Sequence, residues 1–130
     1  MSFNWSAVLA IGFGGFIGAV ARAYAVHFTN KYVPLEFPLG ILAVNILGSF
    51  LIGLVFAVFA HYNLSDNLKM FLTTGFLGAL TTYSTFAIET FFLFQSSFVL
   101  AVANIALNVF GTIFAAAFGY KVLQFFLYHL

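Results

Sequence analysis

The sequence predicts an all-α membrane protein with four transmembrane helices, the third of which is broken in the middle of the membrane. Of its 130 residues, 64% are hydrophobic and only 5% are charged. A helix that spans a bilayer needs about 20 apolar residues. Four segments meet this requirement, at residues 5–27, 38–61, 68–94 and 98–128. Because little sequence lies outside them, residues 1–130 are expected to form a single transmembrane domain surrounded by membrane lipid.

The composition excludes several classes of function. Four lysines and arginines against three acidic residues leave no basic surface for nucleic acid. Cysteine is absent, and three scattered histidines do not form a metal-binding motif. The sequence contains no nucleophile–base pair, no paired carboxylates and no phosphate-binding loop. We therefore expect a protein that is not an enzyme and does not bind nucleic acid.

The first span carries small residues at helical spacing. Gly14, Gly18 and Arg22 are four residues apart and share one helical face, so another helix can approach closely there. Arg22 is expected near the far end of this span. Two roles are open for it: an interfacial arginine that reaches the lipid headgroups, or a positive charge that attracts anions to a vestibule.

The second span places Asn45, Ser49 and Gly53 on one face. A buried asparagine is costly unless it forms hydrogen bonds, so Asn45 either links helices or faces a hydrated pathway. In the connection that follows, Ser65 is expected to cap the third helix, with Asp66 in its first turn.

The third span contains the strongest signal for a break. Two glycines three residues apart are followed by paired hydroxyl residues within an otherwise apolar segment. The backbone carbonyls that a break releases must be buried in protein, face water or hold a cation. The alternative is a small-residue packing face whose hydroxyls bond back to the preceding turn. The residues concerned are Gly75, Gly78, Thr81, Thr82, Ser84 and Thr85.

Beyond the expected break, two stripes of side chains share the third span. One consists of hydroxyls that end in a carboxyl group, and the other is mostly aromatic. Glu89 is the single acidic residue well inside a span, which makes it a functional candidate, although a protonated and hydrogen-bonded carboxyl is an alternative. The stripes are Thr82, Thr85 and Glu89 on one side and Tyr83, Phe86 and Thr90 on the other.

The fourth span repeats the polar pattern, because Asn104, Asn108 and Thr112 share one face. Amides and hydroxyls donate hydrogen bonds, and the edges of aromatic rings carry partial positive charge. These groups suit a small, strongly hydrated anion, but they also suit water or another polar solute. The residues alone therefore indicate a narrow polar pore.

The cations are balanced between the two sides expected for a four-span protein. Arg22 and Lys31 fall towards one side, and Lys69 and Lys121 towards the other. The positive-inside rule then gives almost no preferred orientation. This balance arises either by chance among four charges or from dual topology, in which copies insert both ways and pair antiparallel. Because four helices seldom enclose a polar pathway, we expect an oligomer in either case.

The chain resembles the Fluc family of bacterial fluoride channels over nearly its whole length. The resemblance implies an antiparallel dual-topology homodimer with two pores in the bacterial inner membrane. It also implies passive fluoride efflux, which gives fluoride resistance, and a central sodium ion held by the carbonyls of Gly78 and Thr81. The matching motifs are GGFIGAVAR (14–22), PLGILAVNILGSFLIG (38–53), TGFLGALTTYSTF (74–86) and NIALNVFG (104–111).

By motif position, the resemblance also implies roles for individual residues. Asn45 matches a pore-lining asparagine, and Arg22 matches a vestibule arginine. Three features depart from the family: Tyr83 replaces a phenylalanine, Ile41 replaces a threonine, and both fourth-span positions are amides. The remaining residues implied to contact fluoride are the aromatic pair Tyr83 and Phe86, the polar run Ser84, Thr85 and Glu89, and the fourth-span Asn104 and Asn108.

Two other functions compete with this interpretation. The first is a small antiparallel multidrug exporter, a class with a similar chain length. Members of that class resemble proton-coupled exchangers and have an essential glutamate in the first span. Here the first span has no acid, and Glu89 lies in the third. A non-transporting membrane assembly subunit is the second rival, in which the Asn and Thr stripes only link helices.

Overall fold

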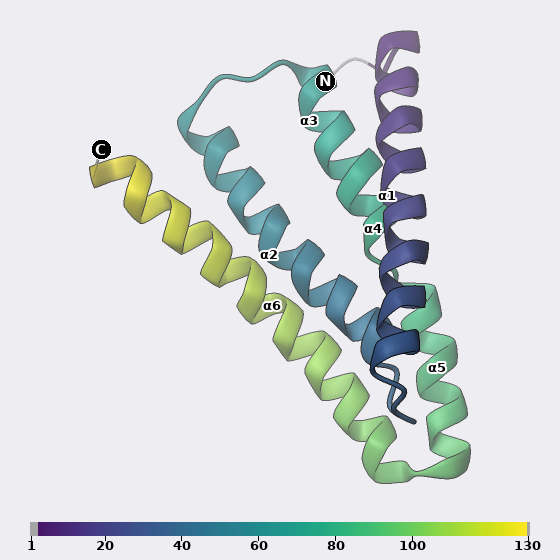
Figure 1. The fold of residues 1–130 in the computed structure, drawn as a ribbon. Helices are drawn as coiled ribbons and strands as arrows, with labels where there is room; N and C mark the ends of the chain where they lie inside the picture. The colour runs from purple at the N-terminus through teal and green to yellow at the C-terminus, as the bar shows by residue number, and fades with distance from the viewer. Residues whose placement is uncertain (1–2, 130) are drawn as a thin grey trace.

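The structure, a computed structural model, describes residues 3–129, and its elements are all helical (Figure 1). Four helical stretches are long and apolar enough to cross a membrane. They coincide with the four predicted spans, although the first extends five residues further, from residue 27 to residue 32. The prediction of an all-α protein with four apolar spans is thereby confirmed. The stretches are Trp5–Tyr32, Leu39–His61, Asp66–Ser96 and Phe98–His129.

Short polar side chains cap the starts of four helices. Helix α1 (Trp5–Tyr32) starts where the Asn4 side chain accepts the N–H of Ala7 at 3.0 Å. Helix α3 (Asp66–Met70) starts at Ser65, whose hydroxyl accepts the N–H of Leu68 at 3.2 Å, as the sequence predicted. Each cap satisfies one of the N–H groups that a helix start leaves without a partner.

The third span consists of four consecutive segments. The short helix α3 widens into a π-helical stretch, η1 (Phe71–Leu77), which is followed by α4 (Gly78–Leu80) and, after the break, by α5 (Tyr83–Ser96). Between α4 and α5, Thr81 and Thr82 adopt extended backbone with ψ of 156° and 126°. The predicted break is confirmed. The π-helical turns before it were not predicted, and such turns occur frequently at functional sites.

The helices form two layers that diverge from a common end (Figure 1). Helix α1 packs along the third span, mainly on η1 and α4, whereas α2 (Leu39–His61) packs along α6 (Phe98–His129). The layers meet near α5 and separate towards the end that carries α3 and the C-terminus. Ser97 alone connects α5 to α6, and its hydroxyl caps α6 by accepting the N–H of Leu100 at 3.2 Å.

Glycines permit a close helix contact in the layer formed by α1 and the third span. A Cβ atom on Gly18 would collide with the carbonyl oxygen of Phe76, and one on Gly75 would lie 2.9 Å from the carbonyl oxygen of Ile11. The sequence predicted a close approach at Gly14 and Gly18, and the structure confirms it. We call this contact between α1 and η1, formed by Gly14, Gly18 and Gly75, the glycine crossing.

The third span contains both the predicted break and the predicted packing face, at different residues. Gly75 belongs to a small-residue packing face, because it lies against the backbone of α1. Thr81 and Thr82 form the break, six and seven residues further along the chain. The packing face fixes the first half of the span against α1. The break that follows therefore lies at a defined position beside α2.

Candidate functional site

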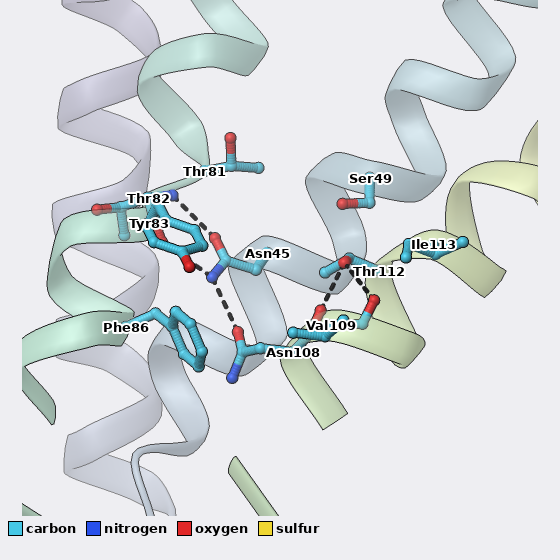
Figure 2. A pocket seen from close by; sticks show the side chains of 10 residues that line it. All are labelled: Asn45, Ser49, Thr81, Thr82, Tyr83, Phe86, Asn108, Val109, Thr112 and Ile113. Carbon is cyan, nitrogen blue, oxygen red and sulfur yellow. Dashed lines mark hydrogen bonds between the residues drawn. The ribbon is translucent and has the colours of Figure 1, made fainter. Parts of the chain in front are cut away.

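A cavity of about 330 Å³ lies at the break, where α2, α5 and α6 meet (Figure 2). Its lining includes four of the residues implied to contact fluoride, from three different spans, and also Thr81. Of the described residues that line it, none is charged. The lining residues are Asn45, Ser49, Thr81, Thr82, Tyr83, Phe86, Asn108, Val109, Thr112 and Ile113.

Asn45 on α2 binds both the backbone N–H and the backbone carbonyl of Thr82 at the break. Its Oδ1 accepts the N–H of Thr82 at 2.8 Å, and its Nδ2 donates to the carbonyl of Thr82 at 3.1 Å. An interrupted helix leaves such backbone groups without partners, which is costly in a membrane. Asn45 therefore links helices and lines the cavity at the same time, so the two roles that the sequence left open are compatible.

A second amide, Asn108 on α6, continues from Asn45. Its Oδ1 accepts from Asn45 Nδ2 at 3.0 Å, and its own Nδ2 lies 3.0 Å from both the carbonyl and the Oδ1 of Asn104. Asn104 then donates to the Thr90 hydroxyl at 2.9 Å, and Thr90 donates to the Phe86 carbonyl at 2.7 Å. We call these four linked side chains, Asn45, Asn108, Asn104 and Thr90, the amide chain.

Asn104 lies behind the cavity. Its side chain is only 1% exposed and is enclosed by α5 and α6. The resemblance implied that it contacts fluoride, but here its amide is bonded to Asn108 and Thr90 within the subunit. The reason is its position one turn before Asn108 on the face that packs against α5. Asn104 supports the cavity wall through Asn108.

The two aromatic residues share the cavity but differ in burial. Tyr83 and Phe86 have ring centroids 5.3 Å apart, with planes inclined at 68°. Phe86 is 7% exposed and packs with Ile41 and Val44, whereas Tyr83 is 78% exposed at the subunit surface. The edge-to-face geometry directs the edge of one ring at the face of the other. A tyrosine so exposed in the middle of a span leaves the cavity open on that side of the subunit.

The polar run after the break is divided between two places. The Thr82 hydroxyl accepts the N–H of Thr85 at 3.3 Å and so caps α5, and it lies 3.4 Å from the Ser84 hydroxyl. Ser84 and Thr85 do not belong to the cavity lining. Glu89 lies on a different recess of about 380 Å³, whose lining also includes Glu36. The structure therefore separates Glu89 from the site at the break.

A third and smaller recess, of about 110 Å³, contains the two residues implied to hold sodium. Gly78 and Thr81 both line it, on the side of the break that faces α2. In an unbroken helix the N–H of Thr82 would bond the carbonyl of Gly78, but here it donates to Asn45. The break thus removes the usual helical partner of the Gly78 carbonyl, as a carbonyl ligand for a cation requires.

Arg22 occupies a different depth from the one predicted. It was expected near the far end of the first span, but α1 continues for ten residues beyond it, to Tyr32, or about 15 Å at 1.5 Å per residue. Its Nη1 donates to the carbonyl of Thr81 at 3.3 Å. The position near the end of the span is therefore corrected, because the guanidinium reaches a carbonyl released by the break.

Four residues of the site or its support were missing from the predicted set. Helical spacing placed Ser49 and Thr112 on the same faces as Asn45 and Asn108, but they were not named as site residues. Thr90 was recognised only as a member of the aromatic stripe, and its bond to Asn104 depends on how α5 packs against α6. The role of Thr82 rests on its backbone, for which side-chain spacing gives no signal.

Comparison with known proteins gives a consistent family. Residues 9–120 match the family model described as CrcB-like protein, Camphor Resistance (CrcB). A protein of Sulfurimonas denitrificans named fluoride-specific ion channel FluC is 50% identical over 123 residues, which cover 93% of this chain and 95% of the relative. A protein of the same name from Campylobacter jejuni is 48% identical over 118 residues, covering 90% and 97%. Another from Nautilia profundicola is 42% identical over 123 residues, covering 93% and 96%.

Proposed function

The chain belongs to the family of CrcB-like proteins, and we propose that it is a channel that conducts fluoride passively across the membrane. The names of its relatives support the choice of ion. The observation that carries the proposal is the uncharged cavity at the break, where amides, hydroxyls and ring edges converge. Fluoride accepts hydrogen bonds and is strongly hydrated, so a pathway through lipid must replace its water with such donors.

The absence of charge from the described lining favours a channel over an exchanger. A fixed positive charge in the cavity would bind fluoride too tightly for release, whereas several weak donors allow the ion to enter and leave. A proton-coupled exporter needs a carboxyl group at its substrate site. Here Glu89 lies on a separate recess, away from Asn45 and Phe86.

We propose that the working unit is an antiparallel homodimer. A single subunit exposes Tyr83 in the middle of a span and leaves the cavity open beside it. A second copy would close this side, since polar surface facing lipid is costly. Dual topology is supported by the cations: with Arg22 at the level of the break, one membrane side has Lys31 and the other has Lys69 and Lys121. A difference of one charge still gives little orientation bias.

A C-terminal reporter tests this topology. Fused to the full chain in a bacterial membrane, it should be detected on both sides in comparable amounts. Adding three lysines to the connection between α2 and α3 should force one orientation and reduce fluoride flux. Undiminished flux from a uniformly oriented population would exclude the antiparallel pair.

A structural sodium ion fits the residues present, provided that two copies contribute. Each subunit offers the carbonyls of Gly78 and Thr81 on one recess, so a pair would offer four. Carbonyls of unwound helices are suitable sodium ligands. The Thr81 carbonyl also accepts from Arg22, but an oxygen with two lone pairs can hold a second partner. When bound, the ion would supply positive charge that fixes the break, and it would take no part in moving fluoride.

In the cell, such a channel would let fluoride leave after it has entered as hydrofluoric acid, and so confer resistance. We place it in the inner membrane of a bacterium, as expected for four apolar helices and for the bacterial relatives.

Efflux from liposomes tests the function directly. Purified protein is reconstituted into liposomes loaded with potassium fluoride, and a fluoride electrode records efflux after valinomycin is added. We expect fast fluoride efflux, little chloride efflux, and weaker activity when sodium is replaced by potassium or N-methylglucamine. Flux that requires a proton gradient would favour the exporter instead. A folded dimer without flux would favour the assembly subunit.

A further inference from the structure

The amide chain has one direction, which is set by backbone groups at its ends together with the Thr90 hydroxyl. At one end the N–H of Thr82 can only donate, so Asn45 must present Oδ1 to it and Nδ2 to Asn108. At the other end the carbonyls of Asn104 and Phe86 can only accept, so Asn108 and Thr90 must donate to them. Each link therefore donates in the same sense, from α2 through α6 to α5.

This direction affects what an anion meets in the cavity. Both contacts of Asn45 Nδ2 are already made, to the Thr82 carbonyl and to Asn108 Oδ1. An anion gains this donor only by displacing one of these two acceptors, of which Asn108 Oδ1 belongs to a side chain and the other to the backbone. Asn108 cannot simply turn its own Nδ2 towards the anion, because that nitrogen is held by two oxygens of Asn104. Asn108 Oδ1 thus remains in place as a competitor for the Asn45 donor.

Thr90 maintains this arrangement from outside the cavity. Its hydroxyl accepts from Asn104 Nδ2, which leaves Asn104 Oδ1 pointing at Asn108. Thr90, Asn104 and Asn108 are all buried, so an unpaired polar atom there is costly. Without the hydroxyl, Asn104 Nδ2 would have no acceptor on α5, and the hydrogen bond that holds the amide in this orientation would be lost. The amide could then rotate and donate to Asn108 Oδ1, and Asn108 would give up its bond to the backbone carbonyl of Asn104, which lies within the helix, and turn its Nδ2 towards the anion.

We propose that Thr90 and Asn104 form a latch of positioning residues that keeps fluoride binding weak enough for rapid release. The latch holds Asn108 as a competing acceptor and so prevents two amides from donating to one ion together. This inference rests on the proposed function, because it concerns the same cavity and the same anion. It assigns a role to two side chains that lie outside the cavity lining.

Substitution of Thr90 separates the latch from simple packing. Thr90→Val keeps the shape but removes the hydroxyl, whereas Thr90→Ser keeps the hydroxyl. In reconstituted dimers we expect Thr90→Val to lower the fluoride concentration at half-maximal current by roughly tenfold, the equivalent of one buried hydrogen bond. Its maximal current should fall because release is slower. Thr90→Ser should resemble the wild type.

Thr29→Val serves as the matched control, because the Thr29 hydroxyl donates only to Ala25 within its own helix, at 2.8 Å. It should leave both the half-saturating concentration and the maximal current unchanged. A lower maximal current for Thr90→Val with unchanged half-saturation would show a structural role only and overturn the latch. Wild-type currents for Thr90→Val would overturn it as well.

A second measurement does not depend on conduction. In protein labelled with ¹⁵N-asparagine, Thr90→Val should shift the side-chain amide resonances of Asn104, Asn108 and Asn45, which span three helices. A shift confined to Asn104 would contradict the directed chain. If the wild type carried no fluoride current, the proposed function would fail, yet this spectrum would still test whether Thr90 orients the amides.

Discussion

Two contacts in this subunit join helices by different chemistry. At the glycine crossing, α1 and η1 meet backbone to backbone, and a Cβ atom on Gly18 would collide with the Phe76 carbonyl. In the amide chain, α2, α5 and α6 are joined by side-chain hydrogen bonds of 2.8–3.1 Å. The first contact depends on the absence of side chains, and the second depends on the polarity of particular side chains.

The two contacts differ in whether they contribute to stability alone or also to function. Lipid provides no hydrophobic driving force between helices, so close packing and hydrogen bonds must hold them. The glycine crossing contributes shape alone and has no polar side chain to offer an ion. The amide chain also joins helices, but its first two members line the cavity. Changes at the crossing should therefore affect folding, and changes in the chain should affect flux first.

The largest effect is expected from Gly18→Val. The new side chain would force α1 away from η1, because the atom it meets is backbone and cannot rotate aside. Overpacking of this kind costs about 3 kcal/mol or more. We expect loss of the monodisperse peak of the proposed dimer on size-exclusion chromatography. Gly12→Val is the control on the same helix, since a Cβ there meets nothing within 4 Å. Equal yields of dimer for the two variants would disprove the role of the crossing.

Asn45→Asp should abolish flux while leaving the protein folded. One carboxylate oxygen would still accept from Thr82, but the other would face two acceptors, the Thr82 carbonyl and Asn108 Oδ1. A negative charge there also repels the anion, so we expect flux to fall by about a hundredfold or more. Asn67→Asp, on the exposed surface of α3, should have no effect. Near-normal efflux from Asn45→Asp would assign Asn45 to packing alone.

Phe86→Ile should nearly abolish flux, with a smaller effect on folding than Gly18→Val. The variant keeps apolar volume against Ile41 and Val44 but removes the ring edge from the cavity. Efflux and dimer retention are measured together, and Phe91→Ile on the exposed side of α5 is the control. If Phe86→Ile conducted like the wild type, the aromatic edge would have no role in conduction.

Tyr83→Phe should produce the smallest effect. It removes one hydroxyl from a ring that is already largely exposed, so flux should change by less than roughly tenfold, and it should rise if the hydroxyl retains the ion. The measurement is fluoride efflux beside Tyr128→Phe, which alters a tyrosine at the end of α6. A loss as large as that of Asn45→Asp would show that the hydroxyl itself is an essential donor.

Much of the fold was predictable because its signals are local. Apolar length defined the four spans, and Ser65 marked the start of the third. The spacing of Gly14 and Gly18 predicted the close approach of a second helix, and Gly78 with its threonines predicted the break. In each case a short stretch of sequence limits the backbone without information about distant residues.

The candidate site was predictable in its membership more than in its arrangement. Asn45, Tyr83, Phe86 and Asn108 were expected together, and they line one cavity. The separate recess of Glu89 was not anticipated, because Glu89 shares a helical stripe with Thr82 and Thr85. Helical spacing specifies a face, but seven residues of α-helix extend about 10 Å along it.

By itself, then, the sequence determined which segments cross the membrane, where the third span breaks and which face of each helix is polar. Tertiary structure decided that Arg22 bonds Thr81, that Asn104 lies behind Asn108, and that Phe86 is buried while Tyr83 is exposed. The physical reason is that periodicity fixes directions around one helix axis. The depth at which two helices cross, and therefore which side chains meet, depends on how closely their glycines and amides let them pack.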